Sequence, residues 1–304
     1  MFTIALYAPY QAKGRQASDA AFARVAELDR MMSDYDPESE LMQLCKKPVG
    51  QPVRVSDELF DIIEKSQRVA ELSGGAFDIT VGPVVRLWRR ARRTEELPNE
   101  ELLAKARAAV GWKNLKLNPR DKTVTLTVPS MQLDLGGIAK GYAADQALAV
   151  LKSNGIPRAL VAASGDIAVG DPPPSKPAWR IGIGAMDTGR TNSPQTIHTL
   201  LLKNEAVSTS GDTEQFVVIR GKRYSHVIDP RTGIGLEERL QVTIVGHNAT
   251  DTDSFGKVVS VLGVEEGLRI IEAQPGFAAL VFRKKGEQVE EFKSRRFKSI
   301  PETN

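Results

Sequence analysis

The sequence predicts an α+β fold in which helices pack against mixed or antiparallel sheets. Helical and strand patterns are interspersed along the 304 residues, and several strands are joined by short turns as hairpins. Strands that alternate regularly with helices would instead indicate a parallel doubly wound sheet. There is no internal repeat and no low-complexity tract, and the length suits one large two-lobed domain or two medium ones.

The first half of the chain is expected to form one strand, three helices and a hairpin. Residues 2–8 alternate as a strand does. Apolar residues at helical spacing predict a helix over Ala17–Met32 and a second over Ser56–Leu72, with Ser56 as its N-terminal cap. A third helix is expected over Leu97–Val110, opened by Pro98. The predicted hairpin pairs residues 115–117 with 124–128 across a turn.

The second half opens with a helix that runs to about Ser153. A short buried strand follows at 159–169, broken by Ser164-Gly165-Asp166. The proline-rich run at 171–177 is a stiff surface connection and the best candidate for a lobe boundary. A helix from about Thr252 to Leu262 precedes a final helix and strand, and a basic tail occupies 283–304. Further strands are expected at 179–183, 197–202, 215–219 and 240–245.

Charge and composition exclude several classes of protein. The 41 basic and 38 acidic side chains leave a net charge of +3, and the scattered surplus does not form the continuous basic face of a nucleic-acid-binding protein. No stretch approaches the ~18 apolar residues of a membrane-spanning helix. The single cysteine, Cys45, cannot form an internal disulfide, so it carries no information about the compartment. The sequence leaves open whether a leader was removed.

The stretch DLGGIAKGYAAD at 134–145 places two glycines before a helix and a lysine in the first turn of that helix. One interpretation is a strand that turns sharply into a helix. The other is a phosphate site, because glycine lets backbone N–H groups approach an anion while the helix N-terminus and Lys140 supply positive charge. The chain lacks the glycine patterns of dinucleotide folds and of nucleotide triphosphatases, so such a site would be of another design.

Three more segments hold residues suited to a ligand site. Tyr35 stands in an acidic loop, where it either packs on its neighbours or stacks on a flat ligand. Asp78 and Thr80 follow a glycine pair and act either as a turn stabiliser or as part of a pocket. Thr209 and Ser210 offer hydroxyls of the kind that line phosphate or ribityl oxygens.

His226 lies in the last of these segments and is one of three histidines. It precedes Asp229 and Arg231, which a turn would fold back towards it. The residue is therefore either structural or a catalytic or ligand-binding group.

Five segments occur in a characteristic order along the chain: MSDYDPESE at 32–40, GAFDITVGP at 75–83, LDLGGIAKGYAAD at 133–145, TSGD at 209–212 and HVIDPRTG at 226–233. In this order they resemble the motifs of the ApbE family, the FAD:protein FMN transferases. The likeness runs from the first strand to about Gly263. It implies a single domain over 1–304 whose two lobes clamp one FAD, with Mg²⁺ at the pyrophosphate. Family members move FMN from FAD to a threonine hydroxyl of a partner flavoprotein and release AMP.

The resemblance also implies roles for individual residues. Tyr35 would stack on the isoalloxazine, while Lys140 and the Gly136-Gly137 backbone would serve the phosphates. His226 matches the family histidine near the reaction centre and is assigned as general base. The remaining residues would contact the flavin chain or shape the pocket, and they are Thr209, Ser210, Asp78 and Thr80. Relatives are commonly anchored to or exported across the bacterial inner membrane, which implies the periplasm or cell envelope, with the cytoplasm as the alternative.

The sequence departs from the family at the metal site. Family members carry an aspartate and, four residues later, a threonine, which bind Mg²⁺ together with a carbonyl of the double-glycine loop. Here Asp253 is kept and Gly137 retains its carbonyl, but Lys257 replaces the threonine. An acid followed four residues later by lysine is the favourable order for a helical ion pair, so Lys257 is expected to neutralise Asp253.

The presence of Lys257 can be interpreted in two ways, and three functions remain open. It either repels Mg²⁺ or stands in for the metal as one fixed positive charge on the pyrophosphate. FMN transfer is the main reading, with His226, Asp253 and Lys257 as the catalytic group. Hydrolysis of FAD to FMN and AMP, or FAD binding without catalysis, are the alternatives. Lesser departures are Ser164, where the family usually has glycine, and Thr213, where an aromatic often stands.

Overall fold

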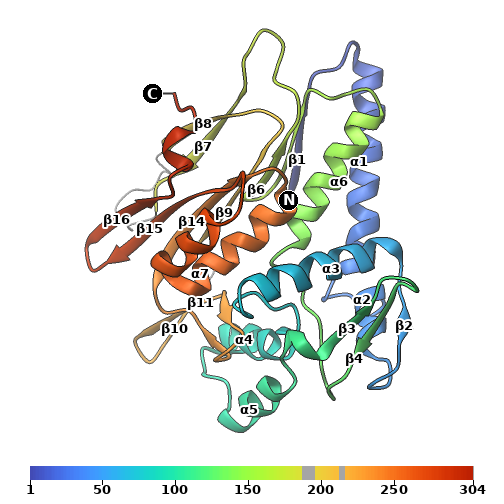
Figure 1. The fold of residues 1–304 in the computed structure, drawn as a ribbon, viewed down its shortest axis with the longest axis vertical. Coiled ribbons are helices and arrows are strands. Elements are labelled where there is room, and N and C mark those ends of the chain that lie inside the picture. The colour runs from blue at the N-terminus through green and yellow to red at the C-terminus, as the bar shows by residue number, and fades with distance from the viewer. Residues whose placement is uncertain (187–195, 212–215, 304) are drawn as a thin grey trace. The chain divides into compact units, whose positions relative to one another are not determined.

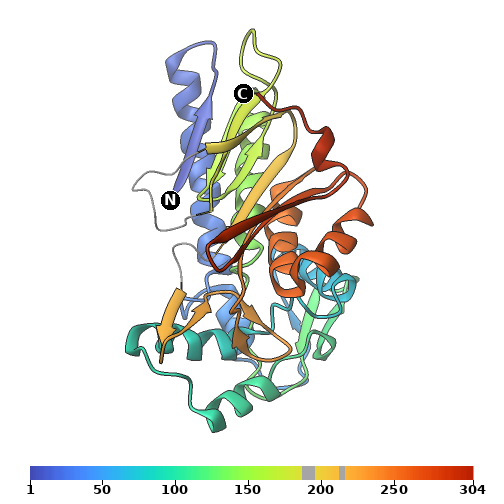
Figure 2. The same cartoon turned by 90° about the vertical axis from the view of Figure 1, so that its left-hand side faces the viewer.

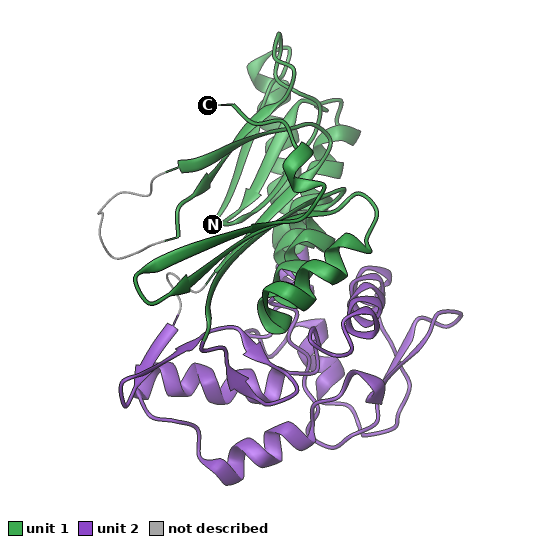
Figure 3. Cartoon of the chain, turned by 60° about the vertical axis from the view of Figure 1, so that its left-hand side comes forward, with its two compact units in different colours: residues 1–27, 140–213, 238–304 green, residues 28–139, 214–237 purple. Residues whose placement is uncertain are grey.

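The computed structural model describes residues 1–186, 196–211 and 216–303, and its mixture of helices and antiparallel sheets confirms the predicted α+β class. The chain forms two compact units (Figure 3). Unit 1 comprises residues 1–27, 140–213 and 238–304, and unit 2 comprises residues 28–139 and 214–237. The proline-rich run at 171–177, predicted as a lobe boundary, lies inside unit 1. It is held there because Arg158 and Trp179 donate to the carbonyls of Pro172 and Asp171 at 2.9 Å.

Unit 1 is built on a seven-stranded sheet in the order β1-β5-β6-β9-β14-β15-β16 (Figure 1). Every neighbouring pair is antiparallel, and a separate hairpin pairs β7 with β8. Antiparallel neighbours explain why the sequence shows hairpins rather than crossover helices. The strands are β1 (Phe2–Leu6), β5 (Ala159–Ala163), β6 (Asp166–Val169), β7 (Trp179–Gly184), β8 (Thr196–Leu202), β9 (Ala206–Gly211), β14 (Arg239–Gly246), β15 (Ala278–Lys285) and β16 (Gln288–Lys293).

Three helices belong wholly or partly to unit 1. They are α1 (Gln11–Met32), whose last residues count with unit 2, α6 (Ala139–Ser153) and α7 (Ala249–Glu272). On one face of the sheet, small residues of α1 and α6 pack on Val161 and Ala168, which brings these two helices side by side (Figure 1). On the other face, β7 and β8 cover Val207 and Leu280. Unit 1 is therefore a helix–sheet–hairpin sandwich in which each sheet face is buried.

Unit 2 contains four helices and three small sheets among the described residues. Val84, Trp88 and Ala91 face the hairpin of β10 and β11, and together they form an apolar core. The helices are α2 (Glu40–Cys45), α3 (Asp57–Leu72), α4 (Gly82–Thr94) and α5 (Glu100–Ala108); the strands are β2 (Val53–Arg54), β3 (Leu115–Asn118), β4 (Thr123–Leu126), β10 (Phe216–Ile219), β11 (Lys222–Ser225), β12 (Ile228–Asp229) and β13 (Ile234–Gly235). Two 3₁₀ turns complete the chain, η1 (Trp112–Asn114) in unit 2 and η2 (Phe297–Ser299) in unit 1.

Most predicted elements form, and the differences have local causes. The strand expected at 159–169 forms with the expected break at 164–166, as β5 and β6, because the backbone turns at Ser164, whose φ is 59°. The residues expected as a basic tail form β15, β16 and a 3₁₀ turn, so the C-terminal hairpin closes one edge of the sheet (Figure 2). The helix α7 is kinked at Gly263, as the two predicted C-terminal helices imply. None of the helices in the described parts of the chain is long and apolar enough to cross a membrane.

Candidate functional site

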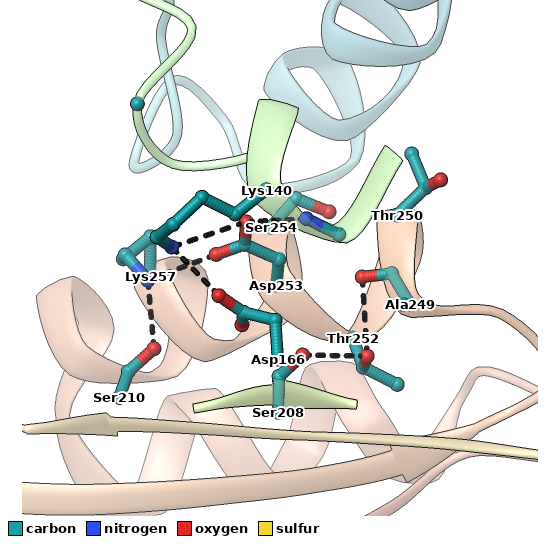
Figure 4. A network of polar contacts seen from close by, with 12 residues as sticks. Lys140, Asp166, Ser208, Ser210, Ala249, Thr250, Thr252, Asp253, Ser254 and Lys257 are labelled. Carbon is teal, nitrogen blue, oxygen red and sulfur yellow. Dashed lines mark hydrogen bonds and ion pairs between the residues drawn. The ribbon is translucent and has the colours of Figure 1, made fainter. Parts of the chain in front are cut away.

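Four charged side chains from three elements of unit 1 meet in one cluster, which we call the Lys–Asp cluster: Lys140, Asp166, Asp253 and Lys257 (Figure 4). Lys140 Nζ on α6 lies 2.7 Å from Asp166 Oδ2 at the start of β6 and 3.6 Å from Asp253 Oδ2 on α7. Lys257 Nζ lies 3.1 Å from Asp253 Oδ1, so the predicted ion pair within the helix forms. The two ammonium groups therefore share Asp253 between them.

Burial and mutual attraction set the ionisation of this cluster. Burial alone would raise the pKa of Asp253, which has no exposed surface, but Lys257 and Lys140 outweigh burial and hold that pKa below its ordinary value. Burial alone would lower the pKa of Lys140, yet Asp253 and Asp166 raise it above its ordinary value. Burial and then Asp253 raise the pKa of Asp166. Asp253 is consequently ionised and Lys140 is cationic at neutral pH.

The stretch that carries Lys140 also docks α6 against α7. A Cβ atom added at Gly141 would lie 2.0 Å from the Ala249 carbonyl oxygen, so only glycine permits this approach. Four residues later, Asp145 Oδ1 accepts from the Ala249 N–H at 2.8 Å, and Oδ2 accepts from the N–H and hydroxyl of Thr250 at 2.8 and 2.6 Å. A carboxylate thus satisfies the first amides of α7, where the helix dipole favours negative charge.

Strand β9 presents its hydroxyls on alternate faces. Ser210 Oγ accepts from Lys257 Nζ at 2.7 Å, and Ser208 bonds Thr252 at 2.8 Å on the same side. Thr209 lies on the opposite face and bonds Thr243 at 3.0 Å. Thr209 and Ser210 therefore present their hydroxyls to opposite faces of the sheet, because successive side chains of a strand alternate. Their expected contact with the flavin or its chain stays a prediction.

The donor set around Asp253 does not fit the Mg²⁺ that the resemblance implies. Oδ1 is paired with Lys257, and Oδ2 accepts from the Gly141 N–H at 3.2 Å. A hard divalent cation takes several oxygen ligands, usually carboxylates and water. Within residues 1–186, 196–211 and 216–303, no group of three or more His, Cys, Asp or Glu side chains is arranged to hold a metal ion. Gly137, the second ligand implied, lies in the turn before α6.

In unit 2, Arg89 on α4 connects the acidic loop with the glycine turn. Its guanidinium pairs with Asp34 and lies 3.1 Å from Asp134 Oδ2, and its Cζ stands 4.2 Å from the centre of the Tyr35 ring. Asp134 Oδ1 in turn accepts from the Gly136 N–H at 2.8 Å. Tyr35 is 75% exposed, so its outer ring face is open to a ligand while Arg89 fixes the inner one.

The turn requires glycine at position 136 because a side chain there would collide with a neighbouring atom. The backbone at Gly136 is not left-handed. A Cβ atom at that position would meet Asp134 Oδ1 at 2.9 Å. The hydrogen bond from the amide back to Asp134 makes an Asx turn directly before α6. Lys140 follows in the first turn of that helix, as the sequence predicts.

Asp78 and Thr80 stabilise a turn in unit 2. Asp78 accepts from the Thr80 N–H and hydroxyl at 2.8 and 2.7 Å and from the Trp112 N–H at 2.8 Å. Thr80 accepts from the Gly111 N–H at 2.8 Å and has no exposed surface. The pair therefore stabilises a turn, and its role in shaping a ligand pocket stays a prediction.

His226 lies in the connection between β11 and β12 and is half-buried. The expected turn forms, but it pairs Arg231 with Asp229 in a two-pronged ion pair at 2.9 Å. Asp212 and Thr213 lie outside the described residues.

Sequence reasoning did not single out Arg89 or Asp166. The arginine run of α4 masks its apolar periodicity in the sequence, although Val84, Trp88 and Ala91 have helical spacing and are buried. Asp166 was considered only as part of a strand break. No sequence pattern indicates that it meets Lys140, because 26 positions separate the two residues.

Known proteins resemble this chain over nearly its whole length. The ApbE family model matches residues 1–281. An FAD:protein FMN transferase of Escherichia coli strain K12 is 30% identical over 277 residues, which cover 90% of this chain and 78% of that protein. One from Klebsiella pneumoniae strain 342 is 32% identical over 278 residues, with the same coverage. The solved flavin transferase ApbE from Vibrio cholerae matches with a TM-score of 0.88 and 28% identity, covering 99% of this chain and 95% of that one.

Proposed function

Since the chain belongs to the ApbE family, we propose that it is an FAD:protein FMN transferase, which moves FMN from FAD to an acceptor flavoprotein. The relatives named above carry this activity in their names and span most of the chain. A threonine hydroxyl of the acceptor is the proposed attacking group, and AMP is the leaving group.

One observation supports a phosphate role most directly. Lys140 stands in the first turn of α6 with 44% of its side chain exposed, while two aspartates keep it charged and in place. A helix N-terminus and a fixed ammonium together favour an anion at this point.

Two other contacts are proposed, one from the exposure of an aromatic ring and one from the position of a hydroxyl group. Tyr35 offers one ring face, which suits stacking on the isoalloxazine, and Arg89 holds the opposite face. Ser210 Oγ, held by Lys257, is the hydroxyl of β9 on the side of the Lys–Asp cluster. Thr209 is left out of the proposed contacts because it bonds Thr243 on the other face of the strand.

The proposed reaction is a phosphoryl transfer in which one protein side chain acts as the general base. The acceptor oxygen forms a bond to the phosphorus of the FMN half, and the bond from that phosphorus to the bridging oxygen breaks as AMP leaves. His226 is the proposed base, which takes the hydroxyl proton. Lys140 neutralises charge on the phosphates.

A second candidate is FAD binding without turnover, which the Lys257–Asp253 pair favours because it occupies the carboxylate that the family's metal would use. Hydrolysis of FAD by water would need the same groups, so only the products distinguish it from transfer.

The test is incubation of the protein with FAD and an acceptor flavoprotein domain, with and without Mg²⁺. Transfer predicts covalent flavin on the acceptor, seen by intact mass, together with an equal amount of AMP. An acceptor with its target threonine changed to alanine should gain no flavin. AMP without covalent flavin would indicate the hydrolase, bound FAD with neither product would indicate the binder, and absence of FAD binding would refute the proposal.

A matched pair of variants locates the site. Lys140→Met removes the proposed phosphate contact and should lower the transfer rate at least tenfold. Lys152→Met removes an exposed lysine from the last turn of the same helix and should leave the rate unchanged.

A further inference from the structure

We propose that Lys257 takes the place of a divalent cation in this protein, so that ammonium groups neutralise the phosphates of FAD without a metal ion. The proposal rests on the proposed function for the identity of the ligand. Its first support is the disagreement between the donor set of unit 1 and the metal that the family implies.

Lys257 is built into the site rather than lying at the surface near it. Only 18% of its side chain is exposed, and its Nζ is held by Asp253 at 3.1 Å and by Ser210 at 2.7 Å. A flexible surface lysine would not have two fixed partners from two elements. The position of the ammonium is thus set by α7 and β9 together.

The sequence makes room for this arrangement. A Cβ atom at Gly256 would lie 2.7 Å from Ser210 Oγ, so glycine at this position permits β9 to come close enough for Ser210 to reach Lys257. The spacing of Asp253 and Lys257 on one helical face supplies the second bond. Both contacts depend on residues within one turn of α7.

Charge balance opposes an added metal. The Lys–Asp cluster holds two ammonium and two carboxylate groups, so it is formally neutral. A divalent cation placed on Asp253 would meet the Lys257 ammonium at short range, and the two positive charges would repel each other. It would also have to displace a hydrogen-bonded partner from a carboxylate that has no exposed surface.

An anionic diphosphate is the ligand that fits such a cluster. An ammonium group has three donors, and Asp253 and Ser210 take two of those of Lys257 within the described residues. The third is available to a phosphate oxygen, beside the 44% exposed Lys140. Two cations of single charge then serve the phosphates in place of one divalent ion.

The experiment measures metal binding and FAD binding separately. Mn²⁺ alone, followed by electron paramagnetic resonance, reports metal uptake without any flavin. FAD is titrated by quenching of flavin fluorescence in EDTA and in millimolar Mg²⁺. We expect no Mn²⁺ uptake by the unaltered protein at millimolar concentration, and FAD dissociation constants that agree within twofold in the two buffers.

Variants at one position connect the result with Lys257. Lys257→Thr should take up Mn²⁺ and should bind FAD at least tenfold more tightly in Mg²⁺ than in EDTA, whereas Lys257→Arg should remain independent of metal. Lys203→Thr, which changes an exposed lysine, is the matched control and should behave as the unaltered protein does. Circular dichroism checks that each variant folds. If Lys257→Thr does not fold, Mn²⁺ uptake is measured on Lys257→Met instead.

Two results would overturn the inference. One is stoichiometric Mn²⁺ uptake by the unaltered protein, or a tenfold loss of FAD affinity in EDTA. The other is a folded variant without Lys257 that still excludes Mn²⁺, because some other feature would then keep the cation out. If FAD fails to bind in both buffers, the proposed function fails, while the Mn²⁺ measurement still tests the exclusion of metal.

Discussion

Replacing Gly141 by alanine tests whether the close approach of α6 and α7 positions the Lys–Asp cluster. The added Cβ atom would lie 2.0 Å from the Ala249 carbonyl oxygen and 3.0 Å from Asp253 Cβ. Ordinary contact begins at 3.4 Å, so the backbone at Ala249 must move by about 1.4 Å. A backbone atom cannot rotate out of the way as the end of a side chain can.

The cost follows from overpacking in a rigid contact. Such strain costs about 3 kcal/mol, and the better helix propensity of alanine returns about 1 kcal/mol. We therefore expect a net loss of about 2 kcal/mol in the free energy of unfolding, or roughly 4 to 8 °C in Tm. The shift of α7 also displaces Asp253 and Lys257 from Lys140, so FAD affinity should fall at least tenfold.

The assay is thermal unfolding by circular dichroism together with FAD titration. Gly184→Ala is the control, because an added Cβ atom there meets nothing within 4 Å. It should change stability by less than about 0.5 kcal/mol. A Gly141→Ala protein as stable as the unaltered one, with unchanged FAD affinity, would refute the reasoning.

Four further predictions concern single side chains, each checked by denaturant or thermal unfolding. Asp145→Asn removes the negative charge at the N-terminus of α7 and should cost about 2 kcal/mol. Arg89→Met leaves two largely buried carboxylates without their shared partner and should cost about 3 kcal/mol, whereas Arg90→Met, at an exposed neighbouring position, should cost almost nothing. Ser164→Gly relieves a backbone with φ of 59° and should stabilise the protein by about 1 kcal/mol; a loss of stability would show that the serine is not strained. Asp253→Asn should cost about 3 kcal/mol at neutral pH. Because the folded pKa of Asp253 lies below its unfolded value, this difference should stay constant above about pH 4 and shrink as the pH falls through the folded pKa. If the difference in free energy of unfolding between the unaltered protein and Asp253→Asn shrank above pH 7 instead, the lowered pKa of Asp253 would be contradicted.

Local features of the fold could be predicted because short-range chemistry determines them. Ser56 caps α3 by accepting from the Leu59 N–H at 3.3 Å, as a serine before an apolar periodic run indicates. The hairpin of β3 and β4 also forms where the turn residues indicate it. The pair of Asp253 and Lys257 was predictable for the same reason, since both residues lie on one helix.

The parts of the site that were missed depend on contacts between distant segments. The strand β9 lacks an apolar signal because Ser208, Thr209 and Ser210 are polar, yet Ser208 and Ser210 are buried in the structure and all three hydroxyls have partners in the sheet or on α7. Unless residues 206–211 are known to form a strand, the sequence does not show that the side chains of Thr209 and Ser210 point to opposite faces. Arg89 reaches Asp34 and Asp134 across 55 and 45 positions of the chain, and no local pattern encodes such a meeting.

The central claim is that Lys140 and the N-terminus of α6 bind the phosphates of a flavin dinucleotide. Comparing the dissociation constants of FAD and riboflavin tests it without an acceptor, because riboflavin has the same ring system and no phosphate. We predict that the unaltered protein binds FAD at least a hundredfold more tightly than riboflavin, and that Lys140→Met lowers only the FAD affinity, by tenfold or more. Equal affinities for the two flavins, or an equal loss of both in the variant, would contradict the account.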